Sequence, residues 1–365
     1  VKLEELVEEV SERTTINNQH PVLTSSRSGI YLQEDYFKKQ VASKDNTGYR
    51  VIRKGEFTYR AMSDTGEFYP NKLECTDIGI VSPAYPVFKI KDYRILPDYL
   101  KYYFKSRSFQ KSITAFVQGS TRASMKFGKM KSISIDLPDE DKQNQILNTI
   151  GILENIIDKY ELEIDHLNNL IKARFVEMFR RNNIDVISVG DAVELINGRA
   201  FKPTHWMADG LPIIRIQNLN DKTAPFNYFD GIYDKKNYVK KGELLFSWSG
   251  TPGTSFGAFI WDREPGILNQ HIFRVLPKID LELNYLRYAL NDQLEIIISK
   301  AHGGVGLQHI TKGELEKVLI PNPNIEQQHS FSNFVAQVDK SKFAVQKSLE
   351  KTQLLFDSLM QEYFG

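Results

Sequence analysis

The sequence predicts an α+β protein in which two tandem mixed α/β domains are separated by two long antiparallel coiled-coil helices. Three observations lead to this fold class. A proline-free run at 141–181 carries apolar residues in a heptad pattern. The second half of the chain repeats the first at an offset of 185 to 187 residues. The sequence outside these helices alternates aromatic, strand-like segments with turns. The predicted arrangement is pseudo-twofold and quasi-circular.

The first long helix is predicted at 141–183. Its apolar residues recur in alternating steps of four and three, which indicates a coiled-coil seam rather than the face of a globular helix. At about 1.5 Å per residue, some 40 residues would make a rod of roughly 60 Å. Its apolar stripe therefore needs a partner helix. The predicted seam residues are Ile146, Ile150, Leu153, Ile157, Tyr160, Ile164, Leu167 and Ile171.

The internal repeat supplies that partner. A shift of 185 residues places 133–146 on 318–331, so that Pro138 meets Pro323 and Gln143 meets Gln328. A shift of 187 places RKGEFTY on KKGELLF, and a shift of 186 places YLKYYF on YLRYAL. Because small changes in offset suffice throughout, the chain is two copies of one unit.

The second long helix is predicted at 326–365. Its seam is poorer, since Lys342 falls where Ile157 stands in the first copy. A polar seam residue costs stability but fixes register, although a lysine can also extend out to solvent. Two such helices pack most simply antiparallel, which predicts that the chain termini lie close together. The predicted seam residues are Phe331, Val335, Val338, Lys342, Val345, Leu349 and Phe356.

The mixed domains are predicted at 1–140 and 184–325. In the first domain we expect an amphipathic helix at 1–15, strands between 25 and 92, helical text at 96–116 and a short strand at 133–135. The second domain should repeat this order.

Composition excludes several classes of protein. There are 47 Lys and Arg residues against 46 Asp and Glu, so any polyanion site must come from local clustering. Cys75 is the one cysteine of the sequence, which leaves no disulfide frame and makes the cytosol the default location. No run approaches 18 apolar residues, so no membrane partner is expected.

Catalytic motifs are missing from the sequence. It contains no P-loop, no G-x-S-x-G, no H-E-x-x-H and no glycine-rich fingerprint for a dinucleotide or S-adenosylmethionine. The seven His residues do not form metal-ligand spacings. The sequence therefore predicts no catalytic residue and no metal site, and a duplicated unit of this kind reads as a binding scaffold.

Basic residues cluster in the first domain. Eight Lys and Arg residues lie between Lys101 and Lys131 without any acid, and aromatic residues are interleaved with them. The loop at 118–122 combines small residues with a guanidinium, which suits phosphate. A solvated helix face is the plain alternative. The candidate DNA contacts are Arg27, Lys38, Lys39, Lys44, Arg50, Arg53, Arg60, Arg107, Thr121, Arg122 and Lys126.

The second domain presents polar and aromatic residues instead. Arg, Asn and Gln are the side-chain types that read base edges in the major groove. Different polar residues on a repeated frame suggest two readers of different content. The candidates are Arg199, Lys202, His205, Trp206, Arg215, Gln217, Asn218, Trp248, Asn269, Gln270 and His271.

Over its full length the chain resembles the specificity (S) subunits of type I restriction-modification systems. The resemblance rests on the repeat of a mixed domain followed by a long helix, and on the entry to that helix. The entry reads IPNPNIEQ at 320–327 and, in a degenerate form, IDLPDEDK at 135–142. The segments 25–30, 59–63 and 268–271 are also similar to target-recognition text.

The resemblance implies a function. Each target-recognition domain would bind half of a split, asymmetric site in double-stranded DNA. The helices would set the gap between half-sites and dock two modification (M) subunits, which would carry S-adenosylmethionine and methylate adenine. Restriction (R) subunits would add ATP- and Mg-dependent cleavage. This chain itself would need no cofactor and would catalyse nothing.

Two alternatives from other classes stay open. One is a coiled-coil scaffold with two peptide- or sugar-binding domains. The other is a self-sufficient nuclease or methyltransferase, which the missing motifs oppose.

Overall fold

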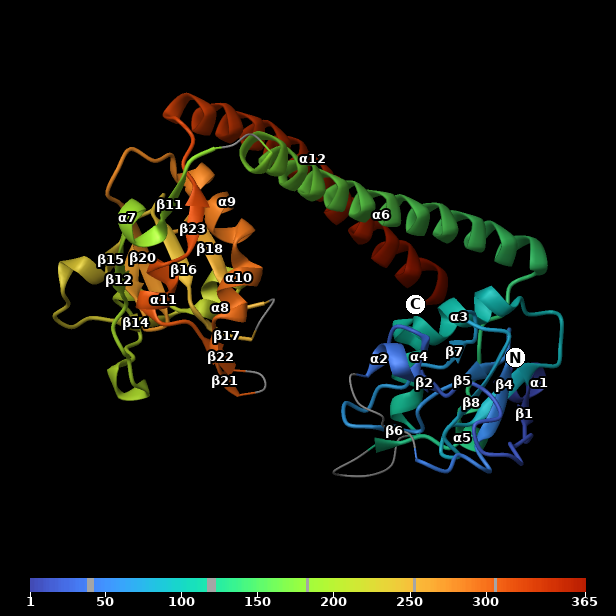
Figure 1. Ribbon diagram of the computed structural model, residues 1–365. Coiled ribbons are helices and arrows are strands. Elements are labelled where there is room, and N and C mark those ends of the chain that lie inside the picture. Colours follow the sequence, from blue (N-terminus) through green and yellow to red (C-terminus); the bar gives the residue numbers. More distant parts are fainter. Residues whose placement is uncertain (38–42, 117–122, 182–183, 252–253, 305–306) are drawn as a thin grey trace. The chain divides into compact units, whose positions relative to one another are not determined.

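The computed structural model describes residues 1–37, 43–116, 123–181, 184–251, 254–304 and 307–365. The chain forms two compact units. Unit 1 comprises Val1–Leu162 and Gln346–Gly365, and unit 2 comprises Glu163–Val345. Figure 1 shows the elements of each unit along the chain.

Unit 1 is built on a four-stranded antiparallel sheet in the order β1-β9-β5-β7. Its strands are β1 (Val7–Val10), β9 (Val87–Ile90), β5 (Phe57–Thr58) and β7 (Asn71–Lys72). The predicted helix at 1–15 is wrong beyond Leu6, because α1 covers only Leu3–Leu6 and β1 follows it at once. Main-chain pairing of β1 with β9, with Val7 opposite Ile90, outweighs the local helical pattern.

Smaller strand pairs and helices complete unit 1. The segment 96–116, predicted to be helical, forms two helices, α3 and α4. They are separate because Ser106 caps α4, its side chain accepting a hydrogen bond from the N–H of Phe109. The predicted strand at 133–135 is reduced to one bridge between Ser134 and Lys2. The elements are β2 (Leu23–Ser25), β3 (Ile30–Leu32), α2 (Gln33–Tyr36), β4 (Arg50–Arg53), β6 (Met62–Ser63), β8 (Ile78–Val81), α3 (Pro97–Lys105), α4 (Arg107–Thr114), β10 (Ala123–Ser124) and α5 (Phe127–Met130).

Aromatic rings fill the core of unit 1. Phe57 stacks on Phe88 with ring centroids 5.4 Å apart, and Phe104 meets both rings edge-on. Both ends of the chain enter this core, because Leu3 and Phe364 belong to the same cluster of buried residues. The ring of Phe364 lies 4.9 Å from that of Tyr99. The core thus ties the two ends of the chain into one unit.

Unit 2 repeats the sheet of unit 1 in the order β12-β20-β16-β18. These strands are β12 (Val193–Asn197), β20 (Ile272–Pro277), β16 (Leu244–Ser247) and β18 (Gly257–Ile260). A second sheet has the order β14-β13-β19-β15, in which β13 (Leu211–Ile214) runs parallel to β19 (Gly266–Leu268). The other strands are β11 (Val186–Ser188), β14 (Asn227–Phe229), β15 (Tyr238–Val239), β17 (Ser249–Gly250), β21 (His302–Gly304), β22 (Leu307–His309) and β23 (Leu319–Pro321).

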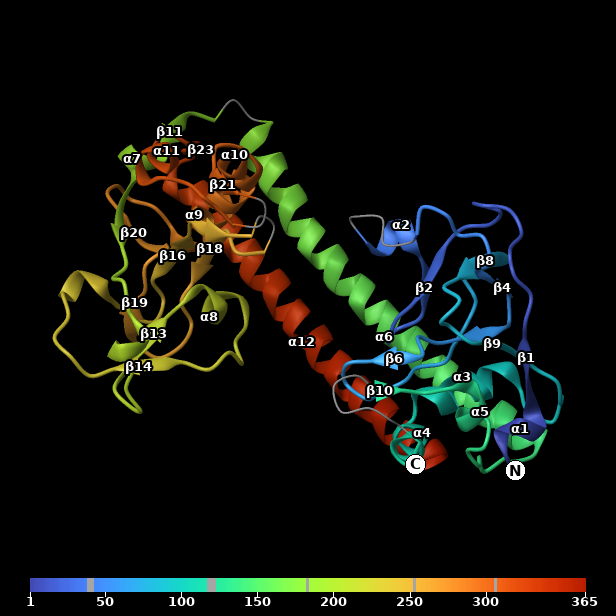
Figure 2. The same cartoon turned by 90° about the horizontal axis from the view of Figure 1, so that it is seen from below.

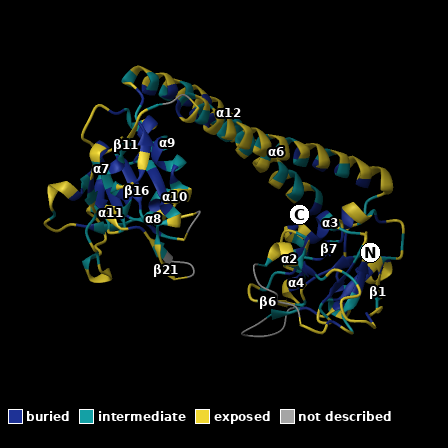
Figure 3. Cartoon of the chain, viewed as in Figure 1, coloured by how far each residue is buried: buried dark blue, intermediate teal, exposed yellow. Residues whose placement is uncertain are grey.

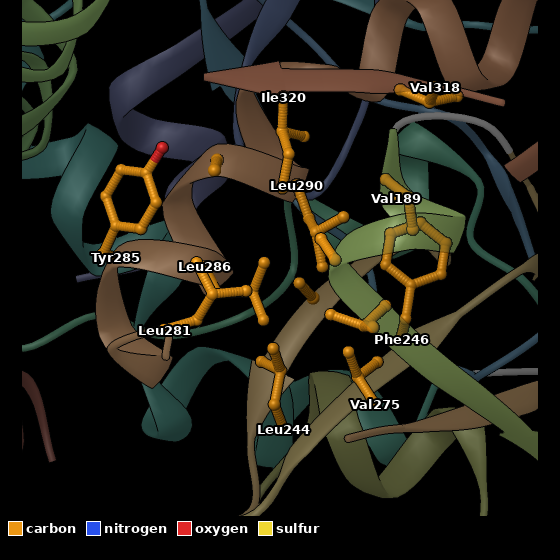
Figure 4. Packing of buried hydrophobic residues seen from close by; sticks show 14 of the residues in the cluster. Val189, Leu244, Phe246, Val275, Leu281, Tyr285, Leu286, Leu290, Val318 and Ile320 are labelled. Atoms are coloured by element: carbon orange, nitrogen blue, oxygen red, sulfur yellow. The ribbon is translucent and has the colours of Figure 1, made fainter. Parts of the chain in front are cut away.

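Helix α9 (Leu283–Asp292) covers the repeated sheet of unit 2. Leu286 and Leu290 of this helix lie near Leu244 and Phe246 of β16 in a core with little solvent access (Figure 4). The Tyr285 ring packs on Phe175 and Phe179 instead. The remaining short helices are α7 (Val189–Ala192), η2 (Pro203–His205), α8 (Ile216–Asn220), η3 (Lys235–Asn237), α10 (Leu294–Ser299) and α11 (Lys312–Glu316).

The two long helices are α6 (Glu140–Phe175), which continues into the π-helical turn η1 (Val176–Arg180), and α12 (Ile325–Phe364). In unit 2 they run antiparallel, because Phe175 packs on Phe331 while the earlier Asn168 bonds to the later Lys342. In unit 1 the start of α6 shares a core with the end of α12. The predicted class, a mixed α/β chain with two long helices, is confirmed.

All of the residues predicted for the helix seam are buried or half-buried, whereas the outer sides of both helices are largely exposed (Figure 3). At the polar seam position, Nζ of the half-buried Lys342 donates a 2.6 Å hydrogen bond to Oδ1 of Asn168. The ammonium therefore has a partner on the facing helix. No helix among the described residues is long and apolar enough to cross a membrane.

Candidate nucleic-acid interface

A basic hollow of about 600 Å³, here called the unit 1 groove, lies beside α4. Arg27 comes from the turn between β2 and β3, Lys105 ends α3, and Arg107 and Lys111 are one turn apart on α4. The cap at Ser106 sets the angle between α3 and α4, so Lys105 and Arg107 reach the same space. The lining is Arg27, Thr65, Gly66, Glu67, Tyr69, Lys105, Arg107, Gln110, Lys111 and Thr114.

The charge in this groove is only partly neutralised. Glu67 is the one carboxylate among the described lining residues, and it lies 3.7 Å from the mostly exposed guanidinium of Arg27. That guanidinium also sits over the Tyr69 ring at 5.3 Å. Loss of surrounding water lowers the pKa of Lys105, and the nearby charge of Lys101 lowers it further. The groove has the excess of cations that a phosphate backbone requires.

A neighbouring hollow of about 720 Å³ shares Arg27, Lys105 and Arg107 with the unit 1 groove. On its other side it is lined by carboxylates of the long helices within unit 1, Glu154, Asp158 and Asp357. These carboxylates make that part of the surface unfavourable for a polyanion, so a phosphate chain would follow the α4 side.

The structure brings together Arg27 and Arg107 from the predicted set, and adds Lys105 and Lys111, which sequence reasoning did not select. Both lysines belong to the acid-free run, but a run does not show which bases share a groove.

The other basic candidates of unit 1 lie elsewhere. Arg53 forms two hydrogen bonds of 2.6 and 2.9 Å with Glu12, and Arg50 binds Glu9 at 2.8 Å. Lys44, Arg60 and Lys126 are exposed. Lys38, Lys39, Thr121 and Arg122 lie outside the described residues.

Most polar candidates of unit 2 meet at one end of the parallel strands β13 and β19, shown together in Figure 2. Arg215 follows β13 and Asn269 follows β19, and the N–H of Asn269 donates to the carbonyl of Ile214 at 3.0 Å. Arg199 forms a bridge with Asn269, and its carbonyl accepts from the N–H of Gln270 at 2.8 Å. We call this set, with Trp248 and His271, the unit 2 edge.

His271 is held in an unusual conformation at this edge. Its φ is 72°, in the left-handed region that few non-glycine residues adopt. The N–H of Trp248 donates to its carbonyl at 3.1 Å, and the two rings lie 4.9 Å apart. Burial lowers the pKa of the His271 imidazole, and His309 lowers it further. Nδ1 of His271 and Oδ1 of Asn269 are buried without a partner among the described residues.

Two arginines of the unit 2 edge are fixed by aromatic rings. Arg199 donates to the carbonyl of Ile232 and lies 4.9 Å from the Phe229 ring. Arg215 donates to Oδ1 of Asn227 at 2.8 Å and lies 5.6 Å from the Trp206 ring. Such contacts hold a guanidinium in one orientation.

The remaining candidates of unit 2 are used partly by the fold. Asn218 is buried, and its amide binds the N–H of Arg215 and the carbonyls of Ala224 and Pro225. Gln217 donates to the carbonyl of Pro225, and Nδ1 of His205 accepts from the N–H of Lys202. We therefore leave Asn218 out of the proposed contacts. In the part of the chain that the structure describes, no group of three His, Cys, Asp or Glu residues could hold a metal ion.

Fold and surface define a duplicated protein of mixed helix and sheet, with a basic groove in one unit and a polar, aromatic edge in the other. Comparison with known families is more specific. The model of the type I restriction modification DNA specificity domain matches residues 14–173 and 182–354, and the chain belongs to this family. One match falls in each half of the chain, which confirms the predicted duplication and the resemblance.

Two curated relatives are similar. The type I restriction enzyme EcoBI specificity subunit of Escherichia coli is 28% identical over 164 residues, which is 43% of this chain and 33% of that protein. The MjaVIII specificity subunit of Methanocaldococcus jannaschii is 23% identical over 362 residues, covering 88% of this chain and 83% of that protein.

Solved structures share the fold. A chain from a structure of the type I R-M system aligns with a TM-score of 0.60 and 17% identity, covering 100% of this chain and 96% of its own length. The S subunit of the M. genitalium type I system aligns with a TM-score of 0.53 and 13% identity, with coverage of 100% and 95%.

Proposed function

We propose that this chain is the DNA-recognition subunit of a type I restriction-modification complex and binds a bipartite, asymmetric duplex target, one half-site per unit. The observation that carries the proposal is the contrast between the two surfaces on one repeated frame. Two identical readers would call for a palindromic target, whereas two different readers call for an asymmetric one.

The unit 1 groove suits the phosphate backbone. Lys105 ends α3, Arg107 begins α4 and Lys111 lies one turn further along α4. All three line the groove, and none of them forms an ion pair with a carboxylate among the described residues. Contacts of this kind position a protein on DNA without reading its sequence.

The unit 2 edge suits base reading. Arg215 can offer a guanidinium fork to guanine, and the exposed Gln270 can offer an amide to adenine. The indole N–H of Trp248 donates to Oδ1 of Asn197, and the indole stacks on Phe273. These contacts fix the ring that packs against His271. A side chain that is already fixed loses less entropy when the unit 2 edge binds bases.

The outer faces of the long helices suit protein partners. Several large apolar side chains there are exposed, which marks a protein-binding surface. We propose that two M subunits dock on these helices, that R subunits join the same complex, and that this chain contributes no catalytic group. S-adenosylmethionine, ATP and Mg would then belong to the partners. The exposed residues are Ile152, Leu162, Leu170, Phe343, Leu354 and Leu355.

The test is a map of methylated adenines in a strain that carries this gene and in the same strain without it. The proposal predicts a gapped, asymmetric motif that is methylated only when the gene is present. Identical maps in the two strains, with the partner subunits expressed, would refute it.

A further inference from the structure

A pocket of about 380 Å³ lies in unit 2 between the edge strand β18, the turn that follows it, α8 and α9. Lys222, Asp262, Arg263, Arg287 and Tyr288 are among its lining residues. Neither of the two arginines is among the residues predicted to contact DNA.

Both arginines present donors that the fold leaves unused. The Nε atoms of Arg263 and Arg287 are buried and have no hydrogen-bond partner among the described residues. The two Nη groups of Arg263 donate to the carbonyls of Lys222 and Asn218. Its guanidinium lies 4.4 Å from the centroid of the Trp261 ring. The guanidinium carbon of Arg287 lies 4.6 Å from the centroid of the Tyr288 ring. A buried donor without an acceptor is costly, so an acceptor from outside is favoured.

The internal repeat supplies a matched comparison. Arg287 occupies in unit 2 the position that Lys101 occupies in unit 1. The N–H of Leu96 donates to Gln143, and the N–H of Glu282 donates to the equivalent Gln328. Lys101 follows Leu96, and Arg287 follows Glu282, by the same number of residues. In unit 1 the ammonium of Lys101 is neutralised by both oxygens of Glu74, at 2.8 and 3.0 Å.

Strand register identifies the carboxylate that corresponds to Glu74. Phe57 faces Lys72 in unit 1 as Leu244 faces Ile260 in unit 2, so Asp262 stands where Glu74 stands. Asp262 forms an ion pair with Lys222 instead. Unit 2 therefore keeps a cation at this position, but the equivalent carboxylate pairs with Lys222. Arg287 is left without an ion-pair partner among the described residues.

We infer that this pocket binds a phosphate group through Arg287 and Arg263. A phosphate has enough oxygens to accept hydrogen bonds from two guanidinium groups at once. A carboxylate has only two oxygens, which one guanidinium can occupy in a bidentate pair. The phosphate can come from a DNA backbone or from a free phosphate or nucleotide, and the volume admits either a single phosphate or a small phosphorylated ligand. The binding does not require that the unit 2 edge reads DNA.

The experiment follows the side-chain Nε–H signals of the full chain, labelled with ¹⁵N-arginine, during titration with inorganic phosphate at pH 7.5 and constant ionic strength. Signals of Arg263 and Arg287, assigned from Arg→Lys variants, should shift saturably. Arg287→Ala should weaken phosphate binding about tenfold or more, and Arg287→Lys should weaken it less, because a lysine keeps the charge but loses the fork. Thermal unfolding shows whether each variant folds.

Lys101→Ala is the matched control and should leave phosphate binding unchanged. An equal shift with chloride in place of phosphate, or unchanged phosphate binding in Arg287→Ala, would overturn the inference. A second titration with a DNA duplex distinguishes the sources. Displacement of phosphate by the duplex identifies a backbone phosphate, and retention of phosphate on the DNA-bound protein identifies a free one.

Discussion

Gln143 and Gln328 make the same two hydrogen bonds, one set in each unit. Nε2 of each glutamine donates to a proline carbonyl five residues earlier, Pro138 or Pro323, at 2.9 Å. Oε1 of each accepts the backbone N–H at the start of α3 or α9, from Leu96 at 2.8 Å and Glu282 at 2.9 Å. Both side chains are buried. Each glutamine thus fastens the start of a long helix to the start of an earlier helix of the same unit, α6 to α3 and α12 to α9.

Replacing Gln328 with Ala should destabilise unit 2. The substitution leaves the N–H of Glu282 and the carbonyl of Pro323 without partners, which costs about 2–4 kcal/mol in the free energy of unfolding. Urea unfolding followed by fluorescence measures it. Gln337→Ala, on the exposed side of the same helix, should change stability by less than about 0.5 kcal/mol. Equal effects of the two substitutions would show that the buried hydrogen bonds contribute nothing.

Lys342 and Asn168 should be energetically coupled. The 2.6 Å hydrogen bond between them involves a charged donor on half-buried helix surface, and we expect a coupling of about 1 kcal/mol. A double-mutant cycle with Lys342→Met and Asn168→Ala measures it by urea unfolding. Strictly additive effects would mean that Lys342 extends into solvent.

Unit 2 should lose stability as the pH falls. The pKa of His271 is lowered in the folded protein by burial and by His309, so the unfolded chain takes up a proton at a higher pH than the folded chain does. Stability is therefore fully present above the ordinary histidine pKa of about 6.5 and is lost as the pH falls from there through the lowered value.

Melting temperatures at pH 7.5 and 5.5 test this dependence. His271→Asn should reduce the difference between the two pH values, and asparagine tolerates the left-handed backbone at this position. His329→Asn, at an exposed site on α12, is the control and should leave the difference unchanged. A difference as large in His271→Asn as in the parent would exclude His271 as its source.

Arg107→Ala should weaken DNA binding about equally for all duplex sequences. Loss of one phosphate contact should also reduce the slope of log K against log salt by about 1. Binding to a target and to an unrelated duplex, each at several salt concentrations, gives both numbers. Arg53→Ala removes a cation already paired with Glu12 and should leave the slope nearly unchanged. A change of sequence preference in Arg107→Ala would contradict a backbone role.

Periodicity and self-similarity made the long helices and the duplication predictable, because both signals are written along the chain. The predicted helix starts, 141 and 326, each lie one residue from the observed starts at Glu140 and Ile325. The strand β1 was missed, because its partner β9 lies about 80 residues away and the pairing leaves no local signal.

The site was less predictable for the same reason. Arg27 joins Lys105 and Arg107 only because the turn between β2 and β3 folds over α4. The parallel pairing of β13 with β19, which brings Arg215 beside Asn269, is also invisible to residue spacing. Residue type indicated which side chains suit DNA, but only the fold shows which of them share a surface.

The most direct test of two different readers is exchange of residues 184–325 with the equivalent segment of another family member, followed by mapping of methylated adenines. The exchange keeps unit 1 and its groove unchanged. We expect one half of the methylated motif to change while the other half stays the same. A motif in which both halves change, or neither does, would contradict it.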